Sequence, residues 1–473
     1  MIRKRLGFFL GPFLFFIVFF LEPFEGLNVE ANAVLASTLW IATWWLFETL
    51  HISSTALLPI VLLSLTKGAP IAQTTASYGD KMLFLFLGGF VLAIGMQKWN
   101  LHKRIALTII SKVRSNANGI LLGFILATGL LSMWISNTAA TLMMVTIAAA
   151  LIKEIRELSG NRKFNFFKAI LLGISFSASI GGVATLVGTP TNPIFAAIAS
   201  KLYGHEFSFS TWMTFAMPFS LLMIGICWWI LSHVIFTLKK ENLPLGNEII
   251  IQELKQLGKL TYEEKVVGVI FVSAALLWIL RSLFLNQLIP GMNDTVIAIA
   301  AAATLFIIPA KADKSSTILT WEEAEQLPWG VIILFGGGLS LASAFQSSGL
   351  AEWIGNQLTA VAGLPILVII LIIAVSVNFL TEVTSNVATA SIMMPVLASL
   401  ANAIGIHPYL LMVPATMAAS CAFMLPIATG PNAIAFSAGE LEMKDMVKAG
   451  VWLNIISSLL ISLLVYWLLP FFL

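Results

Sequence analysis

Long stretches without a single Asp, Glu, Lys or Arg limit what this chain can fold into. The clearest are residues 6–21, 212–238, 266–280 and 449–473. About 18 or more consecutive apolar residues cross a membrane as one helix, and the shorter stretches reach that length with their flanks. In lipid the backbone must satisfy its own hydrogen bonds, and the alternation typical of barrel strands is absent. We therefore expect an all-α polytopic membrane protein.

Composition excludes several other classes. Only 10% of the 473 residues are charged, against about 25% in a typical soluble protein. The net charge of +3 is small and its basic residues are local, which predicts no nucleic-acid partner. Cys227 and Cys421 both lie in apolar context and predict neither a disulfide framework nor a metal cluster. The first apolar stretch lacks a clear small-residue cleavage site, so we expect a retained helix rather than a signal peptide.

The few charged segments predict which side of the membrane each loop occupies. Residues 98–114, 153–168, 239–265 and 311–325 each hold several Lys or Arg, as does the N-terminus. The positive-inside rule assigns these segments to the cytoplasm. The loops at 22–32 and 289–294 have no Lys or Arg, which is typical of the outer side. Counting between these marks predicts about 11 transmembrane helices plus shorter, interrupted apolar pieces.

An internal repeat divides the chain into two related halves. The glycine-rich stretch around Gly88 resembles the one around Gly337, an offset of 249 residues. The same offset carries Ser136-Asn137 onto Ser385-Asn386. Two separated matches at one offset indicate related structural units. We expect repeat halves at 1–238 and 266–473, joined by a cytoplasmic linker at 239–265.

A second pair of motifs follows the first in each half. Residues 188–192 read Gly-Thr-Pro-Thr-Asn and residues 428–432 read Ala-Thr-Gly-Pro-Asn, an offset of 240. Gly and Pro interrupt helices and free backbone groups. Interrupted apolar segments at corresponding positions of two halves are the best sequence indicator of a transporter's binding site.

The chemistry of these motifs predicts a paired anion and cation site. Freed N–H groups at helix N-termini attract anions, whereas carbonyl, hydroxyl and amide oxygens suit a hard cation such as sodium. Neither motif contains Lys, Arg or His, so neutral donors and a bound cation would hold the anion. Ser and Asn between membrane helices also act as simple packing contacts. Glu48 and Glu382 are each open to a coupling role or to a structural one.

The apolar stretches contain no motif typical of an enzyme that acts within the membrane. We find no nucleophile with a base, no paired Asp residues and no His-Glu-x-x-His sequence. The prediction is therefore a transporter without catalytic residues.

The motifs resemble those of the divalent anion/sodium symporter family. The resemblance rests on Ser132-Met-Trp-Ile-Ser-Asn-Thr138, on Thr381-Glu-Val-Thr-Ser-Asn-Val387 and on the segment 420–434. It implies a fold with two re-entrant hairpins in inverted repeats, in which a transport domain moves as an elevator against a scaffold. It also implies a homodimer in the cell membrane, here the bacterial inner membrane, surrounded by lipid. The expected function is sodium-coupled symport of C4-dicarboxylates such as succinate, malate and fumarate, with citrate as a further candidate.

Residue roles implied by the resemblance fall into two groups. Sodium ligands would be Ser132, Ser136, Asn137 and Gly188 at one site, and Thr381, Thr384, Asn386 and Ala428 at the other. Substrate contacts would be Asn137, Thr138, Thr189, Ser385, Asn386, Val387 and Thr429.

Two departures from the family pattern bear on substrate and coupling. Val387 stands where many bacterial dicarboxylate members have Thr, and some citrate-transporting members resemble this chain there. Gly430 stands where Pro is common. A sodium-independent dicarboxylate exchanger on the same fold remains the alternative.

Overall fold

The computed structural model describes residues 2–22, 24–160, 164–204, 206–238, 246–289, 291–312, 316–357 and 363–472. Its regular elements are helices, apart from one isolated bridge between Pro309 and Thr317 in the described part. The all-α prediction is therefore confirmed. Residues 239–245, the first part of the expected linker, lie outside the described residues.

The α-helices of the first half come first along the chain: α1 (Ile2–Leu21), α2 (Val29–Phe47), α3 (Ile52–Thr55), α4 (Leu58–Leu65), α5 (Ile71–Ala76), α6 (Lys81–Lys98), α7 (Leu101–Ser111), α8 (Ala117–Ser132), α9 (Asn137–Leu158), α10 (Asn165–Val183), α11 (Thr191–Tyr203) and α12 (Phe209–Trp229). A 3-10 turn, Ser77–Gly79, precedes α6, and a π-helical segment, Ile230–Ile235, follows α12.

The remaining α-helices are α13 (Gly246–Gln256), α14 (Tyr262–Leu280), α15 (Asn286–Leu288), α16 (Asp294–Ile307), α17 (Trp321–Ala324), α18 (Trp329–Ser347), α19 (Leu350–Gln357), α20 (Ile366–Thr381), α21 (Asn386–Ala403), α22 (Tyr409–Ala419), α23 (Gly430–Ser437) and α24 (Met443–Leu468). A π-helical segment, Arg281–Leu285, follows α14, and a 3-10 turn, Leu469–Phe472, ends the described chain.

Eight helical stretches of the described chain are long and apolar enough to cross a membrane. Five further apolar helices have only 10–17 residues. Three of these, α8, α20 and α22, lead into the interruptions that the motifs predicted. Helix α1 exposes large apolar side chains, with Phe9 and Phe20 both 70% accessible, as expected of a surface that lipid covers. These features make the chain a multi-pass membrane protein.

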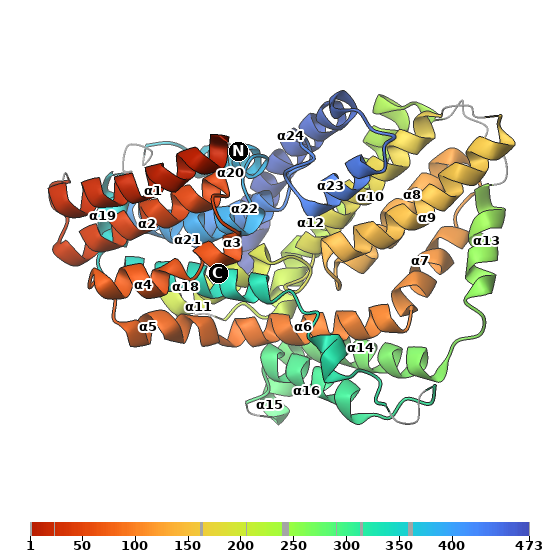
Figure 1. Ribbon diagram of the computed structural model, residues 1–473, viewed down its shortest axis with the longest axis horizontal. Coiled ribbons are helices and arrows are strands. Elements are labelled where there is room, and N and C mark those ends of the chain that lie inside the picture. The colour runs from red at the N-terminus through yellow and green to blue at the C-terminus, as the bar shows by residue number, and fades with distance from the viewer. Residues whose placement is uncertain are drawn as a thin grey trace.

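Two hydrophobic clusters divide the interior. The smaller one joins α1, α2, α4, α18 and α19 with Ala388 of α21, and its Trp45 is fully buried. The larger one runs through most of the other helices. Figure 1 shows α1 and α2 side by side at one end of the molecule, and α8 and α9 toward the other end.

Each half contains a helical hairpin and a broken helix. The hairpins are α8–α9 and α20–α21, and the broken helices are α10–α11 and α22–α23. Helix α10 packs against both arms of the first hairpin, and α22 packs against both arms of the second. The outer pieces are exchanged, because α11 packs on α21 and α22 whereas α23 packs on α9 and α10.

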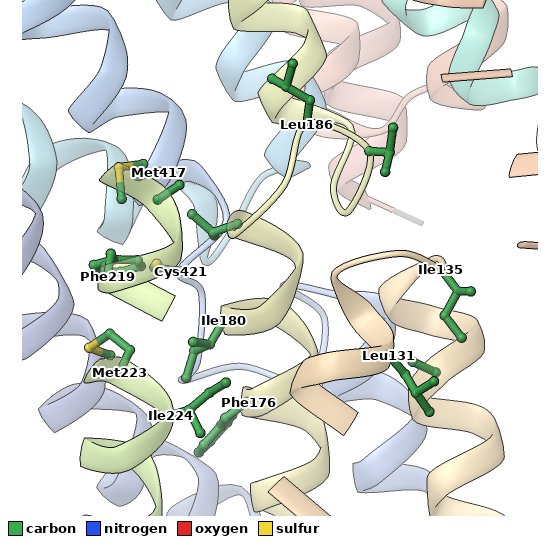
Figure 2. Close-up of a cluster of buried hydrophobic side chains, with 14 of the residues drawn as sticks. Leu131, Ile135, Phe176, Ile180, Leu186, Phe219, Met223, Ile224, Met417 and Cys421 are labelled. Carbon is green, nitrogen blue, oxygen red and sulfur yellow. The ribbon is translucent and has the colours of Figure 1, made fainter. Parts of the chain in front are cut away.

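Helix α10 is buried along almost its whole length. Every residue from Phe166 to Val183 except Lys168 is buried. Figure 2 shows Phe176 and Ile180 of this helix beside Phe219, Met223 and Ile224 of α12. This close apolar packing fixes the position of α10, and therefore also that of Val183, the last helical residue before the interruption.

Candidate functional site

The first hairpin tip is organised by Ser136 and Ser132. Ser136 is the N-cap of α9, and its Oγ accepts a hydrogen bond from the backbone N–H of Ala139 at 3.4 Å. Ser132, at the end of α8, has its Oγ 2.5 Å from the side-chain amide of Asn137. The tip thereby brings two hydroxyls and one amide to the start of a helix.

The second hairpin tip repeats this contact at the same offset. Thr381 Oγ1 donates to Asn386 Oδ1 at 2.6 Å, as Ser132 contacts Asn137 in the first half. Thr381 also lies 3.0 Å from the carbonyl oxygen of Ala419. Thr384 Oγ1 donates to the Leu380 carbonyl at 2.9 Å and is 2.7 Å from Thr389 Oγ1.

The two helix breaks are held by equivalent asparagines. Asn192 Nδ2 donates to the carbonyl oxygens of Gly182 at 3.2 Å and Thr185 at 2.7 Å. Asn432 Nδ2 donates to those of Ala422 at 3.1 Å and Leu425 at 2.9 Å. The offset of 240 relates the two donor asparagines, and it also relates each acceptor carbonyl of the first break to its counterpart in the second. These bonds satisfy carbonyl groups that the interruption leaves without a helical partner.

A cavity of about 760 Å³ lies between the two hairpins and the two breaks. Among the residues expected to contact substrate or sodium, those lining it are Ser136, Asn137, Thr138, Gly188, Thr189, Thr384, Ser385, Asn386, Val387, Ala428 and Thr429. Ser132 and Thr381 do not line it, since both are fully buried beneath the tips. The structure thus brings all seven expected substrate residues to one space.

Four helix N-termini meet at this cavity. Helices α9, α11, α21 and α23 begin at Asn137, Thr191, Asn386 and Gly430, and the cavity is lined by residues at or just before each start. Each N-terminus carries a partial positive charge of about +0.5, which attracts anions. Together they amount to roughly two positive charges, although no Lys or Arg is among the described lining residues.

The Asn137 amide lies among oxygen atoms. One of its two end atoms is 2.5 Å from Ser132 Oγ and 3.2 Å from the carbonyl oxygens of Ala178 and Gly188. With its nitrogen at this position, the amide is satisfied by these oxygens without an ion, because its two N–H groups can donate to them. The hydroxyl and carbonyl oxygens at this tip are of the type that a hard cation such as sodium prefers.

Glu382, which the sequence left open between two roles, is a buried structural acceptor. Its Oε1 accepts from the backbone N–H of Phe423 at 2.8 Å and Met424 at 2.9 Å, and from Asn454 Nδ2 at 2.7 Å. Its Oε2 accepts from the Leu425 N–H at 3.0 Å. Glu382 therefore ties the second hairpin tip to the second break and to α24.

Sequence reasoning missed several residues of the cavity wall. Ser179 of α10 and the aromatic rings of Phe86 and Phe90 line it, as do Pro328 and Val331. Glu48 lines it too and is the one ionisable side chain among the described lining residues. Phe90 belongs to the repeated glycine-rich stretch and Glu48 was left open to a coupling role, whereas the other four lie outside the repeated motifs, where their sequence context gave no signal of proximity.

The described part of the chain contains no group of three or more His, Cys, Asp or Glu that could hold a metal ion. Cys227 and Cys421 are free and buried.

Comparisons with known proteins place the chain in a transporter family. The family model for the sodium:sulfate symporter transmembrane region matches residues 4–473. Two similar relatives are the "sodium-dependent dicarboxylate transporter SdcS" of Staphylococcus aureus strains bovine RF122 / ET3-1 and MRSA252. Each is 47% identical over 476 residues, covering 99% of this chain and 91% of the relative.

Two solved structures share the fold. The Alcanivorax borkumensis YdaH transporter superposes with a TM-score of 0.60 at 14% identity, covering 85% of this chain and 88% of that one. Neisseria gonorrhoeae MtrF, from a class described as antimetabolite efflux pumps, has a TM-score of 0.58 at 13% identity, covering 86% and 84%. At such low identity these two structures establish the fold alone.

Proposed function

This chain belongs to the sodium:sulfate symporter family, and on that premise we propose that it imports C4-dicarboxylates by symport with sodium. Membership makes it a transporter of the cell membrane rather than an enzyme, with sodium as the co-transported ion. The substrates proposed are succinate, malate and fumarate. The name of its Staphylococcus aureus relatives supports this class.

The convergence of four helix N-termini on one cavity is the observation that carries the proposal. A dicarboxylate has two negative charges, which matches the partial positive charge of about +2 that the four ends provide. In each half a Ser-Asn tip and a Thr-containing break face the same space. One carboxylate would contact Asn137, Thr138 and Thr189, and the other Ser385, Asn386 and Thr429.

Sodium would bind beneath the two tips. The first ion would use Ser132, Ser136, Asn137 and Gly188, and the second Thr381, Thr384, Asn386 and Ala428. The oxygens around the Asn137 amide support the first position. With both ions bound next to the cavity, their charge strengthens anion binding, so cation and anion bind together and leave together.

The proposed motion is an elevator within a homodimer. The smaller hydrophobic cluster, built mostly from α1, α2, α4, α18 and α19, supports a scaffold against which α21 of the second hairpin packs. The hairpins and broken helices, with α12 and α24, would form the part that moves. The repeat halves at 1–238 and 266–473 each contribute a hairpin and a broken helix to that part.

Substrate-free proteoliposomes provide the test. An inward sodium gradient should drive uptake of labelled succinate into vesicles that contain no carboxylate. An exchanger, the second candidate, would require internal carboxylate and would ignore sodium. Potassium in place of sodium is the matched control for ion-specific driving force.

Two substitutions test the site assignment in the same vesicles. Asn137→Ala and Asn386→Ala should each abolish sodium-driven uptake, because each removes an amide that faces both the cavity and a hydroxyl of its tip. Persistent uptake in either variant would show that the binding site lies elsewhere.

A further inference from the structure

Ser179 has an unpaired hydroxyl at the wall of the cavity. Its side chain lies in α10 and is only 1% exposed, and its Oγ has no hydrogen-bond partner. Among the described residues that line the cavity, Ser179 alone shows this combination. A buried hydroxyl without a partner is destabilising, so its presence here requires an explanation.

Neighbouring serines of the same helix behave as buried helical serines usually do. Ser177 Oγ donates to the carbonyl oxygen of Ile174 at 3.2 Å, and Ser175 Oγ donates to Asn432 Oδ1 at 2.6 Å. Helical Ser hydroxyls commonly satisfy themselves on a carbonyl of the preceding turn. Ser179 departs from its neighbours because it faces the cavity.

The position of Ser179 places it beside the first tip. The preceding residue, Ala178, has its carbonyl oxygen 3.2 Å from an end atom of the Asn137 amide. One turn further, a Cβ on Gly182 would stand 2.5 Å from Asn137 Oδ1. Ala178 and Gly182 of α10 therefore both lie against Asn137, one of the four residues proposed to hold the first sodium ion, and Ser179 lies between them in the sequence.

The two halves differ at this point. The offset of 240 that relates the two asparagines of the breaks carries Ser179 onto Ala419. Ala419 has no hydroxyl, and its carbonyl oxygen lies 3.0 Å from Thr381 Oγ1. The hydroxyl at 179 is thus not a feature that the repeat requires, and it serves the first half only.

We propose that Ser179 Oγ is a further ligand of the sodium ion bound at the first tip. This inference rests on the proposed sodium symport. A bare cation is small enough to reach this enclosed hydroxyl, and a hydroxyl oxygen is the hard type of ligand that such a cation prefers. The first sodium site then has one oxygen ligand more than the second.

Ser179→Ala tests the inference through two measurements on the full-length protein. The sodium concentration for half-maximal succinate uptake should rise at least threefold. Sodium should also raise the unfolding temperature of the purified protein less than it does for wild type. In sodium-free potassium buffer the variant should be as stable as wild type or more stable, since an unpaired hydroxyl has been removed.

Two further variants separate ligation from packing. Ser179→Cys keeps the volume but replaces a hard oxygen with a soft sulfur, so it should weaken sodium dependence as Ser179→Ala does. Ser177→Ala removes a hydroxyl from the same helix that has a partner and does not line the cavity. It should leave the sodium dependence unchanged.

The outcomes are distinguishable from those of the proposed function. An unchanged sodium requirement in Ser179→Ala would overturn the inference, as would a raised succinate requirement alone. Equal loss of stability with and without sodium would also overturn it. If wild type showed no sodium-driven uptake, the proposed symport would be wrong, but the sodium-induced thermal shift of the two proteins would still test Ser179.

Discussion

Gly430 of the second half lies against Thr138 of the first. A Cβ on Gly430 would stand 2.5 Å from Thr138 Oγ1, closer than real contacts allow. The absence of a side chain at 430 therefore lets the start of α23 approach the first hairpin.

Gly430→Ala should weaken succinate binding. The added methyl must displace Thr138 or the start of α23, and overpacking of this kind costs about 1–3 kcal/mol. The half-maximal succinate concentration should rise by roughly fivefold or more. Gly225→Ala is a matched control in α12, since a Cβ there would meet nothing within 4 Å. Equal kinetics for both variants would contradict the steric account.

Val387→Thr should favour succinate. The new hydroxyl would line the cavity beside Asn386 and offer a hydrogen bond of about 0.5–1.5 kcal/mol to a carboxylate. We expect the half-maximal succinate concentration to fall severalfold and that of citrate to change less. Competition between the two acids during sodium-driven uptake measures the ratio, and a ratio equal to that of wild type would remove Val387 from the specificity argument.

Asn432→Ala should destabilise the protein more than a surface substitution does. It leaves the carbonyl oxygens of Ala422 and Leu425 without their donor, at about 1–3 kcal/mol for each buried unpaired group. The unfolding temperature in sodium-free buffer measures this effect. Ser437→Ala, on the exposed end of the same helix, provides a comparison and should change little. Similar unfolding temperatures for the two variants would argue against a bracing role for Asn432.

Glu382→Gln should also lower stability. The carboxylate accepts from three successive backbone N–H groups and from Asn454, and an amide must turn its NH₂ toward at least one of these donors. The expected cost is about 1–3 kcal/mol, visible in the unfolding temperature with or without sodium. A variant as stable as wild type would mean that the second break does not depend on this residue.

Two ion pairs should differ sharply in their contribution. Arg104 contacts both carboxylate oxygens of Glu264 and the carbonyls of Leu257 and Gly258, and the Glu264 side chain is 3% exposed. Arg104→Ala should therefore lower the free energy of unfolding by about 3 kcal/mol. Lys81 pairs with Glu206, but both side chains are nearly half exposed, so Lys81→Ala should cost less than about 1 kcal/mol. Thermal unfolding of the two variants side by side decides the comparison, and equal costs would contradict it.

The repeat made the pairing of the two tips and of the two breaks predictable, whereas the hairpins themselves were implied by the family resemblance. Because related sequences fold alike, an offset of 249 sufficed to pair Ser132–Asn137 with Thr381–Asn386, and the structure shows the same contact in both. The helical class followed from the apolar stretches. About 11 spans were expected, and eight long helices are found in the described part, because arms such as α8 and α20 stop at a tip.

Contacts between the two halves could not be predicted from the sequence. A repeat offset shows which residues are equivalent but does not show which ones are in contact. Gly430 meeting Thr138 and Ser175 meeting Asn432 therefore emerged only in three dimensions. Ser179 was hidden for a related reason, since a Ser in an apolar helix looks the same whether it bonds to its own backbone or faces a cavity.

The exchange of α11 and α23 has a consequence for how the protein is made. The ribosome completes the first hairpin and α10 long before it reaches Gly430, yet α23 is the element that covers them. Until α23 is made, the surfaces of α9 and α10 that it contacts are exposed, and the surface of α11 that contacts α21 is exposed until α21 is made. Neither half is therefore a self-sufficient unit, and the two genes obtained by cutting the coding sequence in the linker should yield transport only when both are expressed in the same cell.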